Sequence, residues 1–357
     1  MSEALLDFFY RMKAQEKILE KIHKIAEQIG RDVNIMEVCG THTQAVSRYG
    51  IRSVMPKNVH LLTGPGCPVC VTAQEDIDAI VSLALAGIPI ATYGDMLRVP
   101  GYFGSLEQAK RNGAQVFTVY STEDALELQK EYPELVFFGL GFETTTPMTA
   151  YAIQKGLSVY STHKLFIPAM HALLNMGEVR IDGFLDPGHV SAVIGTDAYK
   201  GLEASQVITG FNGDDILVAI YMLLLQILEK RKDIENEYRR AVKKEGNPSA
   251  YGKIFEVFEV ADGNWRGFGI IPGSGLEVRK KYEKFDAKKK YKHILDKIDF
   301  SVSKKATGCK CDRVIRGLIT PDQCPMFGKT CTPEKPYGPC MVSVEGGCNV
   351  HYRYRKQ

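Results

Sequence analysis

The sequence predicts an α/β protein with two similar lobes built on mainly parallel sheets, together with a helical, cysteine-rich domain. Short β-rich runs such as VNIMEVCG, HLLTGPG and QVFTVYS end in glycine or polar turns and alternate with helical stretches, as in βαβ units. An apolar run leads into a threonine-rich, glycine-containing turn twice, in MEVCGTHT and FFGLGFETTTP, which suggests two related lobes. Six of the nine cysteines fall in the last 49 residues, which sets that segment apart.

The predicted elements follow in order along the chain. The first helix is amphipathic and covers residues 3–29, and the β-rich alternation begins directly after it. A long helix is expected from Asp215 to about Lys232, and a further helix through YRRAVKK. The chain is therefore divided into lobe I, lobe II and a helical, cysteine-rich domain made of both ends: 31–130, 131–213, and 1–30 with 214–357.

Composition describes a globular protein with ample core-forming residues, since 45% of its 357 residues are hydrophobic. The formal charge of +3 arises from 45 basic and 42 acidic residues, and the basic runs carry no recognition motif, so nucleic-acid binding is not expected. The longest apolar run, Ile216–Leu225, is too short to span a bilayer, so no membrane association is expected either. Unpaired thiols without an export signal predict a cytoplasmic location.

The segment GPGCPVC is a strong redox or metal signal. Gly64 and Gly66 permit a tight backbone approach, the prolines stiffen the turn, and Cys67 and Cys70 are spaced to reach one metal or to form one disulfide. A CPxC sequence at a helix start lowers the pKa of a thiol through the helix N-terminus. The alternative, two buried structural cysteines, fits poorly with the glycine and proline flanks.

The segment CGTHT places Cys39 at the end of a strand and His42 three residues later on a turn. Thiolate and imidazole both suit iron, and ligands of open parallel sheets bind outside the carboxyl ends of strands. A cysteine that closes a strand is equally often a small buried hydrophobe. The Glu143–Pro147 segment either caps the following helix or lines the cleft. His171 and His189 are assigned to core or capping roles and not to a metal site.

The six tail cysteines lie among Gly, Pro, Lys and Thr, where thiols are accessible and the backbone can bend around a ligand. Four thiolates bind zinc or an iron–sulfur cluster, and choosing four of six leaves fifteen possible ligand sets. Structural zinc usually uses CxxC half-sites, which this tail lacks, so a cluster is favoured. A disulfide-stapled extracellular module is disfavoured, because a chain of this length needs no staples.

Together, CGTHT, GPGCPVC, GFETTTP and the tail CKCDRVIRG…CPMFGKTC…CMVSVEGGC resemble the HypD family of [NiFe]-hydrogenase maturation factors over essentially the whole chain. The resemblance implies a [4Fe–4S] cluster on the pattern C-x₁₄-C-x₆-C-x₁₆-C, with four ligands: Cys309, Cys324, Cys331 and Cys348. It leaves Cys311 and Cys340 as a thiol pair beside the cluster, similar in logic to ferredoxin:thioredoxin reductases.

The resemblance further implies a scaffold and redox factor on which an Fe(CN)₂CO unit is assembled with HypC, using cyanide from HypE that HypF has charged. Cys39 is then the iron ligand, with His42 as a second ligand or proton relay. Electrons are expected to pass from the cluster through the Cys311/Cys340 pair to Cys67 and Cys70. The rival hypothesis is an iron–sulfur thiol-disulfide oxidoreductase that uses CPVC, and a structural zinc module is a third.

Overall fold

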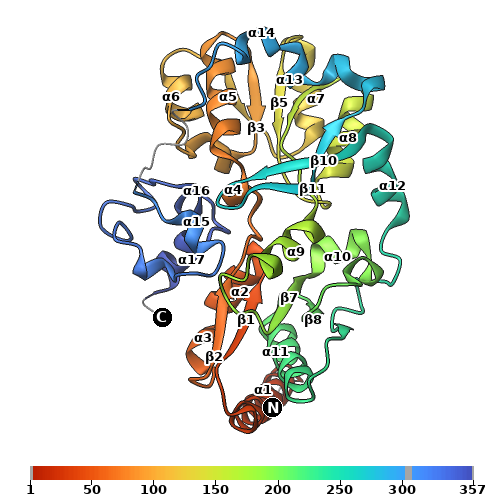
Figure 1. The fold of residues 1–357 in the computed structure, drawn as a ribbon, viewed down its shortest axis with the longest axis vertical. Coiled ribbons are helices and arrows are strands. Elements are labelled where there is room, and N and C mark those ends of the chain that lie inside the picture. Colours follow the sequence, from red (N-terminus) through yellow and green to blue (C-terminus); the bar gives the residue numbers. More distant parts are fainter. Residues whose placement is uncertain (1–2, 302–307, 356–357) are drawn as a thin grey trace.

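The computed structural model describes residues 3–301 and 308–355, and it contains two parallel β-sheets, one above the other (Figure 1). The carboxyl ends of β1 and β2 and of β3 and β5 lead into the region between the sheets, where a two-stranded antiparallel hairpin also lies. Mainly parallel sheets flanked by helices confirm the predicted α/β class. Among the helices in these described ranges, none is both long and apolar enough to cross a membrane.

The lower sheet has five strands in the order β2-β1-β7-β8-β9, and every neighbouring pair is parallel. Its strands are short apolar runs, as expected when helices cover both faces. Their bounds are β1 (Val33–Glu37), β2 (Val59–Thr63), β7 (Gly183–Pro187), β8 (Ser205–Thr209) and β9 (Ile234–Asn236).

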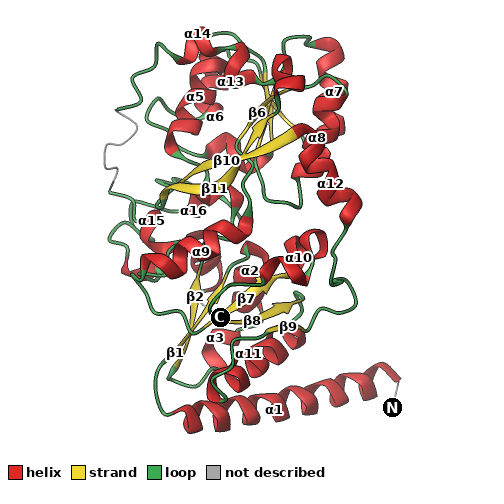
Figure 2. Cartoon of the chain, turned by 45° about the vertical axis from the view of Figure 1, so that its right-hand side comes forward, coloured by secondary structure: helices red, strands yellow, loops and turns green. Residues whose placement is uncertain are grey.

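Two long helices cover one face of the lower sheet. The predicted N-terminal helix is confirmed as α1 (Glu3–Ile29), and it packs against α11 (Gly213–Leu228) at the base of the molecule (Figure 2). Ile35 and Leu185 of the sheet face this helical layer, whereas Met36 and Phe184 face the opposite side, toward the upper sheet. This alternation follows from the two-residue period of a strand.

The upper sheet has four parallel strands in the order β4-β3-β5-β6. Their bounds are β3 (Ile90–Thr92), β4 (Val116–Thr118), β5 (Val136–Gly139) and β6 (Ser158–Ser161). The intervening helices are α5 (Gln74–Leu85), α6 (Leu106–Arg111), α7 (Thr122–Glu131) and α8 (Thr146–Gln154). Ser105 and Ser121 cap α6 and α7 in capping boxes with Gln108 and Asp124, which explains why both helices begin there.

Strand pairing divides the chain differently from the predicted ranges 31–130 and 131–213. β1 and β2 pair with β7 and β8, while β3 and β4 pair with β5 and β6, so each sheet takes strands from both ranges. The chain enters the upper sheet after α4 (Pro68–Val71) and returns to the lower one through α9 (Phe166–Met176). α1 and α11, predicted to join the cysteine-rich part, instead cover the lower sheet. Local patterns locate parallel strands but do not reveal their neighbours.

The segment after α11 differs most from expectation. The predicted helix through YRRAVKK is wrong, because Asn236 binds the Val242 carbonyl with its side chain and Arg240 pairs with Asp215, which holds the segment in turns. After α12 (Pro248–Val257) come β10 (Phe258–Trp265) and β11 (Gly269–Val278), an antiparallel hairpin absent from the sequence-based description. The short α13 (Ala287–Lys290) and α14 (Lys292–Leu295) then pack beside the upper sheet.

The cysteine-rich segment from residue 308 onward contains short helices joined by turns and lies beside the junction of the two sheets (Figure 1). Its α-helices are α15 (Cys311–Val314), α16 (Pro339–Val342) and α17 (Gly347–Tyr354). α17 contacts α2 (Gly40–Arg48) of the lower half, whereas α16 contacts α4 and the 3₁₀ turn η1 (Gly94–Arg98) that follows β3. The Arg98 guanidinium also donates to the Pro333 carbonyl at 2.7 Å. The segment therefore touches both halves of the molecule.

Candidate thiol and metal site

The motifs that follow β1 and β2 meet at one edge of the lower sheet. The Gly64 amide donates to the Glu37 carbonyl at 2.8 Å. The Gly40 amide donates to the Gly66 carbonyl at 3.2 Å. A Cβ at position 66 would overlap the backbone of Cys39, so glycine is required for this close approach. Parallel pairing of β1 with β2 thus places Cys39 directly against the GPGCPVC turn.

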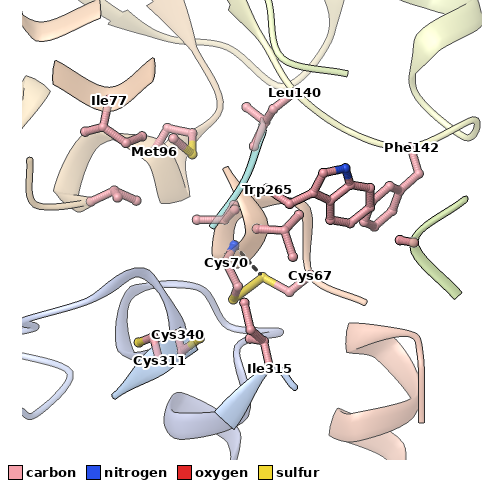
Figure 3. Close-up of a cluster of buried hydrophobic side chains, with 14 of the residues drawn as sticks. Cys67, Cys70, Ile77, Met96, Leu140, Phe142, Trp265, Cys311, Ile315 and Cys340 are labelled. Carbon is pink, nitrogen blue, oxygen red and sulfur yellow. Dashed lines mark hydrogen bonds between the residues drawn. A yellow bond between two sulfur atoms is a disulfide. The ribbon is translucent and has the colours of Figure 1, made fainter. Parts of the chain in front are cut away.

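Cys67 and Cys70 form a disulfide across the first turn of α4 (Figure 3). Cys67 is the N-cap of this helix, and its sulfur accepts a hydrogen bond from the Cys70 amide at 3.2 Å. Pro68 occupies the first helical turn, where its missing N–H leaves no backbone group unpaired. The CPVC segment therefore forms the helix-start turn that its sequence predicts, with both sulfurs buried.

Cys39 is a buried thiol at the N-cap of α2. Burial raises its pKa to about 11, the negative charge of Glu345 adds to the increase, and the amides of His42 and Thr41 oppose it. The side chain is therefore a neutral thiol at neutral pH. A metal that binds here must displace a proton from the sulfur.

His42 lies in the first turn of α2 and is fully buried. Its Nε2 atom donates to the Gly210 carbonyl at 3.0 Å and approaches the Thr209 carbonyl at 3.3 Å. Burial lowers the pKa of His42 to about 4, so the ring is neutral and Nδ1 carries a lone pair that has no hydrogen-bond partner. The ring stacks on Phe211, which in turn stacks on exposed His189.

Glu345 is a residue near Cys39 that sequence reasoning did not select. Its Oε1 accepts a hydrogen bond from the Thr41 hydroxyl at 2.8 Å, and a Cβ at position 40 would lie 2.6 Å from its Cβ. The neighbouring Val344 carbonyl accepts from the Gln44 side chain at 2.9 Å. The loop between α16 and α17 is thereby fixed onto the start of α2. The only sequence signal was an acidic residue before two glycines in EGGC.

The tail cysteines gather beside this loop. Cys309 and Cys311 lie with their sulfurs 3.2 Å apart, and the Cys311 thiol also hydrogen-bonds Cys340. Gly338 sits against both Cys309 and Cys311, where a Cβ would be 2.7 Å from the Cys311 sulfur. Burial raises the pKa of Cys331 to about 11, and the charges of Cys309, Cys311 and Cys324 raise it further. These four thiols therefore lie within electrostatic reach of one another.

Comparison with known proteins identifies the family of this chain. The family model described as "HypD: Hydrogenase formation hypA family" matches residues 13–355. The chain belongs to the HypD family. It is 40% identical to the hydrogenase maturation factor HypD of Escherichia coli over 372 aligned positions, covering 98% of both chains.

Two further HypD relatives show similar agreement. Identity is 42% to the Cupriavidus necator factor, with 91% of this chain and 90% of that protein covered. It is 41% to the Rhodobacter capsulatus factor, with 94% of each covered. The resemblance seen in the sequence motifs is therefore confirmed at the level of the family.

The donor set of this HypD chain suits an iron–sulfur cluster, since Cys309, Cys324, Cys331 and Cys348 offer only soft sulfur ligands in apolar surroundings. Cys309 is half-buried and the other three are buried. Within residues 3–301 and 308–355, no three His, Cys, Asp or Glu side chains are already arranged around a metal position. The Cys309 sulfur lies 3.2 Å from that of Cys311, which is not among the four, so rotation of the Cys309 side chain would be needed to close a cluster site.

The HypD structure also brings the two candidate redox pairs into one region. Helix α16, which carries Cys340, packs against α4, which carries Cys70. Figure 3 shows Cys311 and Cys340 on the tail segment below the Cys67–Cys70 disulfide, and all four cysteines belong to a single buried cluster of hydrophobic side chains. Sequence separation of about 240 residues gave no sign of this proximity.

Proposed function

We propose that this HypD protein is the scaffold and redox factor on which an Fe(CN)₂CO unit is assembled, together with HypC and with cyanide received from HypE, which HypF charges. The observation that supports this most is the position of Cys39. It is a buried strand-end thiol that lies against the GPGCPVC turn and under the loop that joins two tail cysteines. The proposed metal ligand thus lies in the same region as a disulfide and a thiol-rich segment.

Cys39 is proposed to hold the iron, which enters as substrate. The sulfur must lose its proton on binding, and Glu345 is a carboxyl whose charge raises the pKa of this thiol. Neutral His42 keeps its Nδ1 lone pair, so it can accept a proton or act as a second ligand without first being deprotonated. The hydrogen bonds from His42 Nε2 to backbone carbonyls hold this tautomer.

The tail is proposed to hold a [4Fe–4S] cluster on Cys309, Cys324, Cys331 and Cys348, and this cluster would supply electrons to the neighbouring thiol pair. Thiol–disulfide exchange then passes electrons from the Cys311/Cys340 pair to the Cys67–Cys70 disulfide. One thiolate of Cys311/Cys340 attacks the Cys67–Cys70 disulfide and forms a mixed disulfide, and the second closes a Cys311–Cys340 disulfide. Cys67 and Cys70 leave as two thiols, so two electrons and two protons pass between the pairs.

The rival function is that of a thiol-disulfide oxidoreductase, which the disulfide at α4 beside the Cys311/Cys340 pair would equally serve. Infrared spectroscopy of the chain purified anaerobically with HypC separates the two functions. A scaffold shows cyanide and carbonyl stretches from the bound iron unit. An oxidoreductase contains the cluster but shows neither stretch, and a zinc module contains no iron at all.

A further inference from the structure

Several buried polar side chains at the carboxyl ends of the strands lack a hydrogen-bond partner in the described parts of the chain. Asp186 is the clearest case, because it is fully buried and neither carboxyl oxygen is paired. Glu143 leaves one oxygen unpaired, while its other oxygen accepts from the Phe166 amide at 2.9 Å. Buried polar groups are normally paired, so unpaired ones point to a partner that binds later.

Asp186 lies near the end of β1, the strand that Cys39 follows. It belongs to β7, the strand next to β1, and the Val38 amide donates to the Leu185 carbonyl at 3.4 Å. Asp186 therefore lies at the carboxyl edge of the sheet, level with Val38, which is the residue before Cys39. Alternation along β7 turns its side chain to the same face as Phe184, which is the face toward the upper sheet.

Glu143 approaches this place from the upper sheet, as the fourth residue after β5. Asp186, Glu143 and Cys39 all lie near the Tyr199 hydroxyl. Burial first, and then the charges of these three residues, raise the pKa of that hydroxyl. The Tyr199 hydroxyl lies 2.7 Å from Ser191 Oγ, whose own proton goes to the Pro187 carbonyl at 2.9 Å. Carboxyl groups from both halves and the Cys39 thiol thus lie within electrostatic reach of one hydroxyl group.

An unpaired, fully buried carboxylate is very costly, so such a group takes up a proton. Burial raises the pKa of Asp186 well above its usual range and that of Glu143 to about 7. A neutral carboxylic acid has an O–H that can donate. A partner that suits such a neutral acid is a hydrogen-bond acceptor.

We propose that Asp186 and Glu143 are the donors that recognise the two cyanide ligands of the iron unit held at Cys39, one from each half of the molecule. This inference rests on the proposed scaffold function and adds residues that choose between the ligands. A metal-bound cyanide exposes a basic nitrogen lone pair, whereas the oxygen of a metal carbonyl is a weak acceptor. Two acid groups therefore select two cyanides and leave the carbonyl without a donor.

The protonation state is tested first on the chain without iron. Difference infrared spectra between the wild type and Asp186→Asn at pH 7 should contain the C=O stretch of a protonated carboxylic acid that the variant lacks. Asp78→Asn is the matched control, since Asp78 is also fully buried but accepts from the Phe103 amide at 3.1 Å. A difference spectrum that shows only carboxylate stretches for Asp186 overturns the proposal.

The second test uses the complex with HypC. Hydrogen bonding to the nitrogen raises the stretching frequency of a bound cyanide, so Asp186→Leu should move one cyanide band to lower frequency and Asp186→Asn should move it less. Transfer to D₂O should shift that band in the wild type but not in Asp186→Leu. Asp78→Asn should match the wild type in every band.

The outcomes separate the two proposals. If the infrared spectrum of the wild-type complex contains no cyanide and carbonyl bands, the scaffold function itself is rejected. Bands that are present but unmoved by both Asp186→Asn and D₂O overturn the role of Asp186 as a donor while leaving the scaffold intact. If Asp186→Leu does not fold, the D₂O shift of the wild type and the spectrum of Asp186→Asn still test whether Asp186 donates to a cyanide.

Discussion

Removing the charge of Glu345 should make Cys39 more reactive. With a pKa of about 11, roughly one Cys39 in 10⁴ is ionised at pH 7, and the charge of Glu345 is the second cause of this after burial. Glu345→Gln keeps the size of the side chain and can still accept from the Thr41 hydroxyl, but it removes the repulsion. The pKa of Cys39 should fall, and the thiolate fraction should rise tenfold for each unit of that fall.

The assay is the rate of iodoacetamide labelling at pH 8, followed by mass spectrometry of the Cys39 peptide so that the other thiols do not interfere. A tenfold faster rate would correspond to about 1.4 kcal/mol of electrostatic destabilisation of the thiolate. Thr41→Val is the opposing variant, because the Thr41 hydroxyl lowers the pKa of Cys39, and its loss should slow labelling. Circular dichroism checks that both variants fold. A rate for Glu345→Gln within about twofold of wild type would refute the reasoning.

Three further predictions concern the tail and the buried acid. Cys324→Ser should lose cluster iron and sulfide whereas Cys311→Ser retains them, as metal analysis would show, and the reverse result would contradict the ligand assignment. Cys340→Ser should leave the Cys67–Cys70 disulfide unreduced when electrons are supplied, which alkylation and mass spectrometry report; normal reduction would rule out the relay. Burial raises the pKa of Glu143 from 4.5 to about 7. The free energy of unfolding of the wild type should therefore fall by about 3 kcal/mol between pH 4.5 and 7, relative to that of Glu143→Gln. Denaturant unfolding measures both proteins, and the same pH dependence in the two would disprove this.

The direction of the Glu143 effect follows from which state holds the proton. Below pH 4.5 the carboxyl is protonated in both folded and unfolded chains, so its contribution is fully present. As pH rises toward 7 the unfolded chain ionises first, which favours unfolding. Glu143→Gln has no such proton and should lack this part of the pH dependence.

The sequence was sufficient to predict features that depend on neighbouring residues or on one general rule. The period of the first helix, the capping turn at Pro68 and the location of Cys39 and the CPVC turn at strand ends all follow from local patterns. The rule that parallel strands end at one edge then suggests that those motifs share a cleft.

Features that depend on long-range pairing could not be predicted. Nothing local indicates that β1 neighbours β7, and this pairing is what brings Asp186 to the end of β1, which Cys39 follows. Glu345 reaches Thr41 across about 300 residues of chain. The β10–β11 hairpin was missed because its glycine-rich strands, with a bulge near Gly263, lack regular alternation.

The identity of the iron ligand is the central claim, and infrared spectroscopy of Cys39→Ala purified anaerobically with HypC tests it most directly. The account predicts that cyanide and carbonyl bands disappear in this variant while the far-ultraviolet circular dichroism and the cluster iron of the tail remain, because Cys39 is not one of the four proposed cluster ligands. Wild-type bands in a folded Cys39→Ala complex would contradict it and would place the iron unit on another residue.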